Sequence, residues 1–203
     1  MTNEQLIDEY AVARVRRNWA FARDHGEWET MRACFHPDAT VNVSWYSGPA
    51  ATFLDRTVAM STDRRPDERS KHWFGNSRVR LKRDRALLET DAMVLVRDRF
   101  DGHLFDFTWY IRMYDRVERR QGEWRILRMT AIYDKDRADP VVPGAVPASF
   151  FAGAKLDGPE SAIAMMRFRS EKMGRTVPPD IVIGNTPGEK KLRAEAEAWL
   201  AQG

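Results

Sequence analysis

The sequence predicts an α+β fold in which N-terminal helices lie on one face of a bent, mainly antiparallel sheet. Helical spacing of apolar residues dominates about the first 60 residues. Alternating apolar and polar residues with hairpin turns then dominate to about residue 133. With 203 residues, 43% of them hydrophobic and 31% charged, the chain has the length and composition of one globular domain with an extension.

Three helices are predicted before the main strands. Thr2 followed by Gln5 forms a capping box that begins a long first helix, and Gly26 is suited to the left-handed turn that ends it. A second helix is expected at about 27–35, ended by the run 36–38, and a third at 50–60.

The predicted strands follow from alternation and turn residues. A first strand is expected at 40–46, before a turn at 47–49, and the later strands are expected at 72–81, 86–100, 103–117 and 124–133. Asp101-Gly102 and Gln121-Gly122 join consecutive strands as tight turns, so neighbours in sequence should pair antiparallel.

The chain changes character after Asp134, where prolines become frequent, and helices are again expected at 159–173 and 188–201. We therefore divide the chain into a domain at 1–138 and a C-terminal extension at 139–203. Apolar residues in the extension require a surface to cover, which is either the mouth of a pocket in the same chain or a neighbouring subunit, with oligomer packing preferred.

Composition and missing motifs exclude several classes of function. The net charge of +3 comes from interspersed acidic and basic residues, which argues against a nucleic-acid partner. Cys34 is the single cysteine, so an intrachain disulfide and a cysteine-based metal site are excluded. The polar N-terminus and the lack of a long apolar run predict a cytoplasmic protein without a membrane span. No phosphate loop, paired histidine ligands or nucleophile elbow is present, which argues against nucleotide, metal and acyl-enzyme chemistry.

Two residues are candidates for acid–base chemistry. His72 begins a predicted strand, and alternation places it on the same face as Phe74 and Asn76. Asp24 ends the first helix, where a carboxylate gains nothing from the helix dipole. Solvation at the end of the helix would be enough to explain an aspartate at this position. If Asp24 instead contacts His72, the carboxylate would orient the imidazole and raise its basicity.

Three stretches resemble the SnoaL-like family of the nuclear transport factor 2-like superfamily. The residues 19–28, WAFARDHGEW, continuing to 35–39, FHPDA, resemble the opening of these proteins. The run 70–76, SKHWFGN, is similar to the strand that carries the catalytic histidine of scytalone dehydratase and hexachlorocyclohexane dehydrochlorinase. The run 122–126, GEWRI, is similar to the last hairpin. The resemblance covers roughly residues 5–135.

The resemblance implies a cone-shaped α+β barrel with a deep apolar cavity, in which an aspartate and a histidine act without a metal or organic cofactor. Asp24 and His72 occupy the matching positions. The dehydratase's second histidine and its tyrosine correspond to Phe107 and Val43, which argues against the same substrate. A homo-oligomer is implied, with a trimer preferred over a dimer.

The orientation of the strand at 103–117 decides which further residues reach the cavity. One register places Phe105, Phe107, Trp109 and Ile111 on the inner face, whereas a slip of one residue would place Asp106 and Tyr110 there. Both alternatives stay open on sequence alone. The candidate substrate-binding residues are Tyr46, Phe74, Asn76, Phe107, Trp109, Tyr110 and Tyr133.

These observations lead to one main functional hypothesis and two alternatives. The main hypothesis is a cofactor-independent lyase or dehydratase, with isomerase chemistry related to it, that acts on a hydrophobic aromatic or polycyclic small molecule, for example a lignin-derived aromatic. The alternatives are the small β subunit of a ring-hydroxylating dioxygenase and a non-catalytic protein that binds an apolar ligand.

Overall fold

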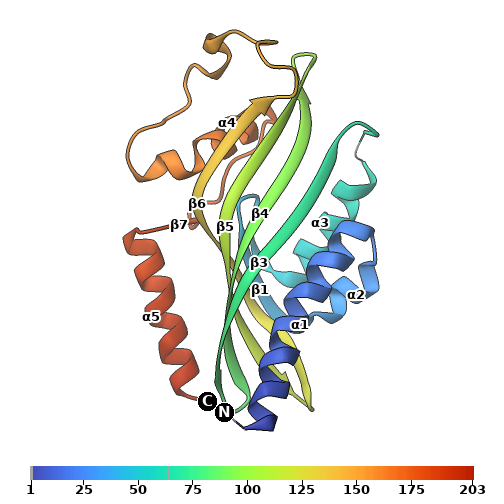
Figure 1. Ribbon diagram of the computed structural model, residues 1–203, viewed down its shortest axis with the longest axis vertical. Helices are drawn as coiled ribbons and strands as arrows, with labels where there is room; N and C mark the ends of the chain where they lie inside the picture. The colour runs from blue at the N-terminus through green and yellow to red at the C-terminus, as the bar shows by residue number, and fades with distance from the viewer. Residues whose placement is uncertain (1, 64) are drawn as a thin grey trace.

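A curved sheet forms the centre of the molecule (Figure 1). On one side lie helices α1 (Asn3–His25), α2 (Trp28–Ala33) and α3 (Ala50–Thr62), and on the other side lies α5 (Pro187–Ala201). The computed structural model describes residues 2–63 and 65–203. The α+β class predicted from the sequence is confirmed, and the sheet is curved without closing on itself. None of the described helices is both long and apolar enough to cross a membrane.

The N-terminal helices begin and end where local residues favour it. Helix α1 spans Asn3–His25, and its predicted capping box is present because the Thr2 side chain accepts from the Gln5 backbone N–H while the Gln5 side chain accepts from the Thr2 N–H. Gly26 ends the helix with a φ of 75°, a left-handed conformation that costs glycine nothing. Helix α2 spans Trp28–Ala33 and helix α3 spans Ala50–Thr62.

The sheet has the strand order β2-β1-β6-β5-β4-β3, so β2 and β3 lie at the ends of this path. Neighbouring strands pair antiparallel, except that β1 pairs parallel to β6, as does the short strand β7. The strand bounds are β1 Phe35–Val43, β2 Tyr46–Pro49, β3 Arg69–Lys82, β4 Arg85–Phe100, β5 His103–Arg120, β6 Glu123–Pro140 and β7 Val182–Ile183.

Two predicted turns lie inside strands. The run 36–38 belongs to β1, and 47–49 belongs to β2. Pro37 is tolerated because the pairing of β1 with β6 shifts between Phe35 and Thr40, which leaves no ladder position for its missing N–H. The run 47–49 pairs antiparallel with β1, so strand pairing overrides its local turn preference.

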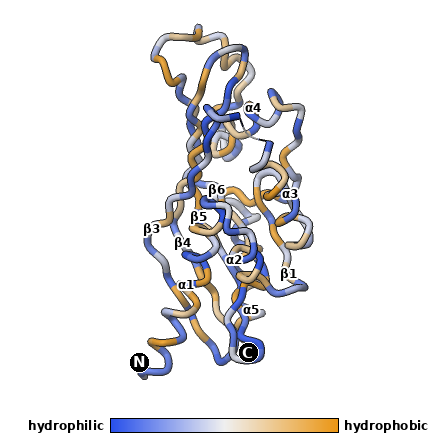
Figure 2. Tube along the Cα trace, turned by 90° about the vertical axis from the view of Figure 1, so that its right-hand side faces the viewer, coloured by the Kyte–Doolittle hydropathy of each residue, from blue (hydrophilic) through white to orange (hydrophobic). Residues whose placement is uncertain are grey.

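The inner face of β5 is the face with Phe105, Phe107, Trp109 and Ile111, all of which are buried in the main core. Asp106 points the other way and pairs with Arg97 across the outer face, the sheet face opposite α1 to α3. Hydrophobic and hydrophilic residues are interleaved along the strands instead of gathering at one end of the molecule (Figure 2). The sheet therefore presents an apolar inner face and a charged outer face.

The residues after β6 return to both faces of the sheet. Short 3₁₀ turns span Ala148–Phe151 and Pro159–Ile163, helix α4 spans Ala164–Lys172, and helix α5 spans Pro187–Ala201. The predicted helix at 159–173 is thus a 3₁₀ turn followed by a shorter α-helix. Helix α5 packs Leu192, Ala196 and Leu200 in a second apolar cluster with Leu87 and Ile132 of the outer face.

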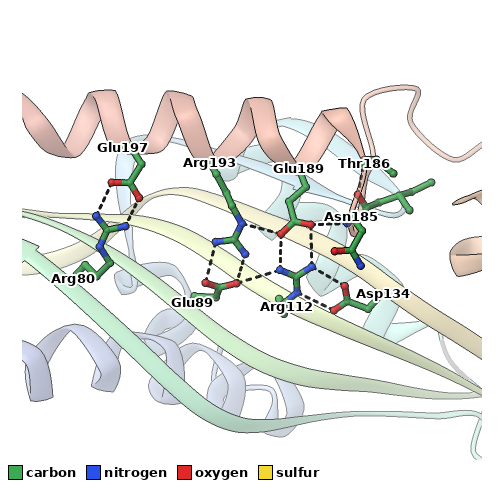
Figure 3. Close-up of polar contacts among 10 residues, drawn as sticks. Arg80, Glu89, Arg112, Asp134, Asn185, Thr186, Glu189, Arg193 and Glu197 are labelled. Atoms are coloured by element: carbon green, nitrogen blue, oxygen red, sulfur yellow. Dashed lines mark hydrogen bonds and ion pairs between the residues drawn. The ribbon is translucent and has the colours of Figure 1, made fainter.

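Charged groups flank this apolar contact between α5 and the sheet (Figure 3). Glu189 accepts from Arg112 Nη1 at 2.5 Å and from Arg193 Nε at 2.8 Å, and Arg112 also donates to both oxygens of Asp134. Burial alone would raise the pKa of the Glu189 carboxyl. The hydrogen bonds from Arg112, the Asn185 backbone N–H and Arg193 outweigh this effect and lower the pKa to about 2. Glu89 completes the network by accepting from Arg193.

We expect Glu189→Gln to lower the free energy of unfolding by about 2 kcal/mol near pH 7, because charged hydrogen bonds to two partly buried arginines are lost. A carboxyl whose pKa is depressed in the folded state contributes stability above its unfolded pKa of 4.5. That contribution is lost as the pH falls from 4.5 toward 2, and the variant should lack this part of the acid destabilisation.

Urea denaturation measured between pH 2 and pH 7 tests this expectation. Glu195→Gln on the same helix is the matched control, because Glu195 is exposed and approaches Arg116 and Arg128 only at 4.0 and 3.8 Å. Equal stability losses in the two variants would show that the network does not hold α5.

Candidate active site

Asp24 and His72 are joined by two hydrogen bonds between α1 and β3. Asp24 Oδ1 lies 2.7 Å from His72 Nδ1, and Asp24 Oδ2 accepts from the His72 backbone N–H at 2.8 Å. The Asp24 side chain is only 2% exposed, and that of His72 is 13% exposed. Asp24 thus lies in contact with His72 and not in solvent, and the contact orients the ring and holds the edge strand against the helix end.

The contact determines which imidazole nitrogen is free. An ionised carboxylate can only accept a hydrogen bond, so Nδ1 must carry the hydrogen. In the neutral ring Nε2 then retains its lone pair. Burial, the largest influence, lowers the pKa of His72 below its usual 6.5. Asp24 opposes this shift, and the positive charges of Arg23 and Arg16 add to it. His72 is therefore neutral at pH 7, which is the form that can accept a proton.

Asp24 stays ionised despite its burial. Desolvation alone would raise the pKa of this carboxyl, but the side-chain and backbone hydrogen bonds from His72 and the charge of Lys71 lower the pKa overall. Lys71 Nζ lies 3.4 Å from Asp24 Oδ2 and is largely exposed. An ionised aspartate on Nδ1 is the arrangement that stabilises an imidazolium when Nε2 takes up a proton.

His72 lines a cavity of about 130 Å³ between the inner face of the sheet and the helices. Most of the wall is aromatic or aliphatic, with a few serines, Tyr133 and three arginines as polar groups. The lining residues are Trp19, Arg23, Val43, Ser44, Trp45, Phe53, Met60, Ser70, His72, Phe74, Val94, Val96, Trp109, Ile111, Met113, Met129, Ala131, Tyr133, Met166, Arg169, Ser170 and Arg175.

A buried ion pair lies near the histidine. Arg16 is 1% exposed and donates from Nε to Asp115 at 3.0 Å, with a second contact from Nη2. The guanidinium lies 4.8 Å from the centre of the Trp19 ring, and Trp19 meets the His72 ring edge-on at 5.7 Å between ring centres. Arg16 thus supports the aromatic wall on which His72 rests.

Three of the predicted substrate-binding residues line the cavity, namely Phe74, Trp109 and Tyr133. The Tyr133 hydroxyl oxygen accepts from the Ser44 backbone N–H at 2.7 Å. Burial raises the pKa of Tyr133 to about 12, so its hydroxyl keeps a proton at neutral pH and can donate it. The roles of these residues toward a substrate remain a prediction.

The other four candidates lie outside the cavity lining. Tyr46 packs against the lining residue Phe53 and donates its hydroxyl to the Pro49 carbonyl at 2.9 Å, and Phe107 is fully buried in the core. Tyr110 lies on the outer face, where Lys135 Nζ is 4.5 Å from its ring centre.

Asn76 is displaced by a β-bulge. Phe74 pairs with Ala92 and Ser77 with Thr90, so Gly75 and Asn76 together lie opposite one residue of β4. The extra residue reverses the alternation after Phe74. Asn76 therefore points to the outer face, and simple alternation along β3 does not hold across the bulge.

Sequence reasoning named the chain's own pocket as one of two surfaces for the extension, but it did not identify the lining residues of α4 or the residue before Asp24. Met166, Arg169 and Ser170 of α4 line the cavity, as do Arg23 and Arg175. The extension thus contributes to the wall of the cavity in its own chain. The apolar stripe of α4 indicates a packed helix, but no local pattern indicates which face of the sheet it meets.

Cys34, His25 and His36 lie outside the cavity lining. Burial raises the pKa of the Cys34 thiol to about 11, so it is protonated and unreactive at neutral pH. His36 Nε2 lies 2.9 Å from the Glu118 carbonyl and His25 Nδ1 lies 2.8 Å from the Phe21 carbonyl. Within residues 2–63 and 65–203, no three His, Cys, Asp or Glu side chains are grouped so as to hold a metal ion.

We expect the His72 imidazole to titrate below pH 6.5, as measured by NMR of its ring signals in the ligand-free protein. Asp24→Asn removes the charge that raises this pKa and should move the midpoint lower. Arg23→Gln removes a charge that lowers the pKa and should move the midpoint higher. His72→Gln assigns the signal by removing it. A midpoint above 6.5 in the wild type, or shifts of the opposite signs, would contradict the described environment.

Comparison with solved structures shows the same fold. A protein assigned as a scytalone dehydratase from Novosphingobium aromaticivorans aligns with a TM-score of 0.56 and 17% identity over 73% of this chain and 97% of that one. A hexachlorocyclohexane dehydrochlorinase aligns with a TM-score of 0.51 and 14% identity over 71% and 97%. The β subunit of a protein assigned as an aromatic-ring-hydroxylating dioxygenase, from N. aromaticivorans, aligns with a TM-score of 0.51 and 17% identity over 63% and 90%.

Sequence comparison finds relatives in fungi and a family model. A PEP2-like protein of Fusarium vanettenii is 25% identical over 145 residues, and an uncharacterized protein of Emericella nidulans is 28% identical over 153 residues. These matches cover 70% and 71% of this chain but 61% and 63% of the relatives, so the chain spans under two thirds of their length. The SnoaL-like domain model matches residues 4–130, and the chain belongs to this family.

Proposed function

We propose that the protein is a cofactor-independent lyase, of the dehydratase or eliminating type, that acts on a hydrophobic aromatic or polycyclic small molecule. One observation carries the proposal: a neutral histidine, held by a buried aspartate, lines an otherwise largely apolar cavity. A general base near neutral pH is suited to removing a proton from carbon.

The proposed step uses His72 Nε2 as the base. It removes a proton from the carbon next to the one that bears the leaving group. The electron pair of the C–H bond becomes the new C=C bond as the bond to the leaving group breaks. The Asp24 charge stabilises the imidazolium that forms. When the leaving group is hydroxide, the imidazolium returns the proton to it, so water leaves and His72 is neutral again.

The cavity wall supports a flat, apolar substrate. Trp19, Trp45 and Trp109 line it together with Phe53 and Phe74, and aromatic faces bury large areas of a planar ligand. The protonated Tyr133 hydroxyl is a suitable donor for a substrate carbonyl, where it would stabilise charge that develops as the proton leaves. Exclusion of water by the cavity wall strengthens the electrostatic interactions of Tyr133 and His72 with the substrate.

The likeness to a scytalone dehydratase and a dehydrochlorinase supports elimination chemistry, since both names describe lyases. An aromatic substrate such as a lignin-derived compound fits the wall composition. We also propose a cytoplasmic homo-oligomer, with a trimer preferred over a dimer. The exposed Trp73 and Leu95 on the outer face, which α5 leaves uncovered, support such an assembly.

The likeness to a dioxygenase β subunit supports an alternative in which the chain is a structural subunit. Under this alternative the chain should copurify from its source with an iron-containing large subunit, as measured by metal analysis of the purified complex. A homogeneous assembly of this chain alone that performs elimination would reject it. A second alternative is a carrier that binds an apolar ligand without converting it.

We expect His72→Ala and Asp24→Asn each to lower the rate of elimination about a thousandfold, because the base or its stabilising charge is lost. A bicyclic β-hydroxy ketone, 3-hydroxy-1-tetralone, is a suitable probe because loss of water and enolisation give fluorescent 1-naphthol. Circular dichroism should show unchanged folding in both variants.

His103→Gln serves as the matched control, because His103 lies at the start of β5 outside the cavity lining. It should retain the wild-type rate. Full activity of either His72→Ala or Asp24→Asn would reject the proposed dyad, and wild-type ligand binding without product would favour the carrier alternative.

A further inference from the structure

The cavity is lined by cationic side chains without acidic ones. Arg23, Arg169 and Arg175 all reach its wall, and no aspartate or glutamate among the described residues does. A largely apolar wall makes each charge more costly and its interaction with an opposite charge stronger than in water. A wall that carries three guanidiniums and no carboxylate favours a ligand with an anionic group over a wholly neutral ligand.

Arg169 is anchored so that part of its guanidinium is left available. Its Nε donates to Asp98 at 2.5 Å, and both side chains are largely buried, at 15% and 9% exposed. The guanidinium carbon also lies 5.4 Å from the Trp109 ring centre and 6.0 Å from that of Phe107. No hydrogen bond joins Nη1 or Nη2 to another described residue, so these two nitrogens retain donor capacity beside the Trp109 ring.

Arg175 follows α4 and has no carboxylate partner among the described residues. Its Nη1 lies 4.0 Å from the sulfur of Met60, another lining residue. A thioether is a weak acceptor that leaves the positive charge uncompensated. Arg175 is exposed, so it places an unneutralised charge where the cavity meets solvent.

Arginines also lie close to His72. Arg23 precedes Asp24 in α1, and its charge and that of Arg16 both lower the pKa of His72. Asp115 pairs with Arg16, and Asp24 contacts His72 and Lys71, so these carboxylates are already engaged. Asp136 accepts the Met166 backbone N–H at 2.7 Å at the start of α4 and is not a lining residue.

We propose that the substrate is an aromatic carboxylate, whose anionic group binds Arg169 and Arg175 while its ring packs against Trp109. Guanidiniums bind carboxylates through paired hydrogen bonds, and an aromatic ring beside Trp109 would bury apolar area at the same time. The inference rests on the proposed function for the role of His72, but charge-selective binding does not depend on turnover.

The test compares two ligands of nearly equal shape, 2-naphthoate and the neutral 2-naphthamide, by titration of the intrinsic tryptophan fluorescence of the full chain. The wild type should bind the carboxylate at least tenfold more tightly than the amide, and only the carboxylate affinity should fall with added salt. Equal affinities for the two ligands would overturn the inference.

Variants locate the anion site. Arg175→Gln should weaken carboxylate binding about tenfold and leave amide binding unchanged, and its exposed position makes misfolding no concern. Arg169→Gln alone would leave the buried Asp98 carboxylate without its partner and could destabilise the fold. The double variant Arg169→Gln/Asp98→Asn removes both charges, so that its carboxylate binding can be measured in a folded protein. Arg167→Gln is the matched control on α4, because Arg167 pairs with Glu160 and does not line the cavity. Unchanged carboxylate affinity in both test variants would overturn the inference.

The outcomes separate this inference from the proposed lyase activity. Selective carboxylate binding that persists in His72→Ala while no elimination occurs in the wild type would retain the anion site and reject the lyase. Elimination of neutral and carboxylate-bearing probes at equal efficiency would retain the lyase and reject the anion site.

Discussion

The two hydrogen bonds between Asp24 and His72 determine how the helical layer meets the sheet. One oxygen accepts from the ring and the other from the backbone of the same residue, so the end of α1 is fixed to edge strand β3 in both position and rotation. A single contact would leave the ring free to turn. Burial raises the pKa of the Asp24 carboxyl, but the hydrogen bonds from His72 outweigh this effect, and the contact at Nδ1 fixes the tautomer of the ring.

Positive charge close to the histidine has an energetic cost and a chemical consequence. Burying Arg16 is tolerated because Asp115 pairs with it and Trp19 lies against its guanidinium. Burial is the largest influence that lowers the pKa of His72, and the charges of Arg23 and Arg16 lower this pKa further.

The C-terminal extension acts on both faces of the sheet. Helix α4 brings Arg169 to the cavity, where Asp98 of β4 fixes it. Helix α5 covers part of the outer face through apolar contacts flanked by the Glu189 network. Strand β6 is 18 residues long and contacts both parts of the extension. The cavity therefore depends on residues that lie outside the region matched by the family model, which ends at residue 130.

The sequence by itself determined the elements whose signals are local. The capping box at Thr2 and the glycine that ends α1 follow from neighbouring residues, and the order of helices and strands indicates the fold class. Which side of β5 faces the core was open on sequence alone and was decided by the tertiary structure. The tertiary structure alone decided that Asn76 faces outward, since the bulge beside it arises from pairing with β4. It alone placed Arg169 in the cavity, because contacts between residues far apart in sequence leave no periodic signal along the chain.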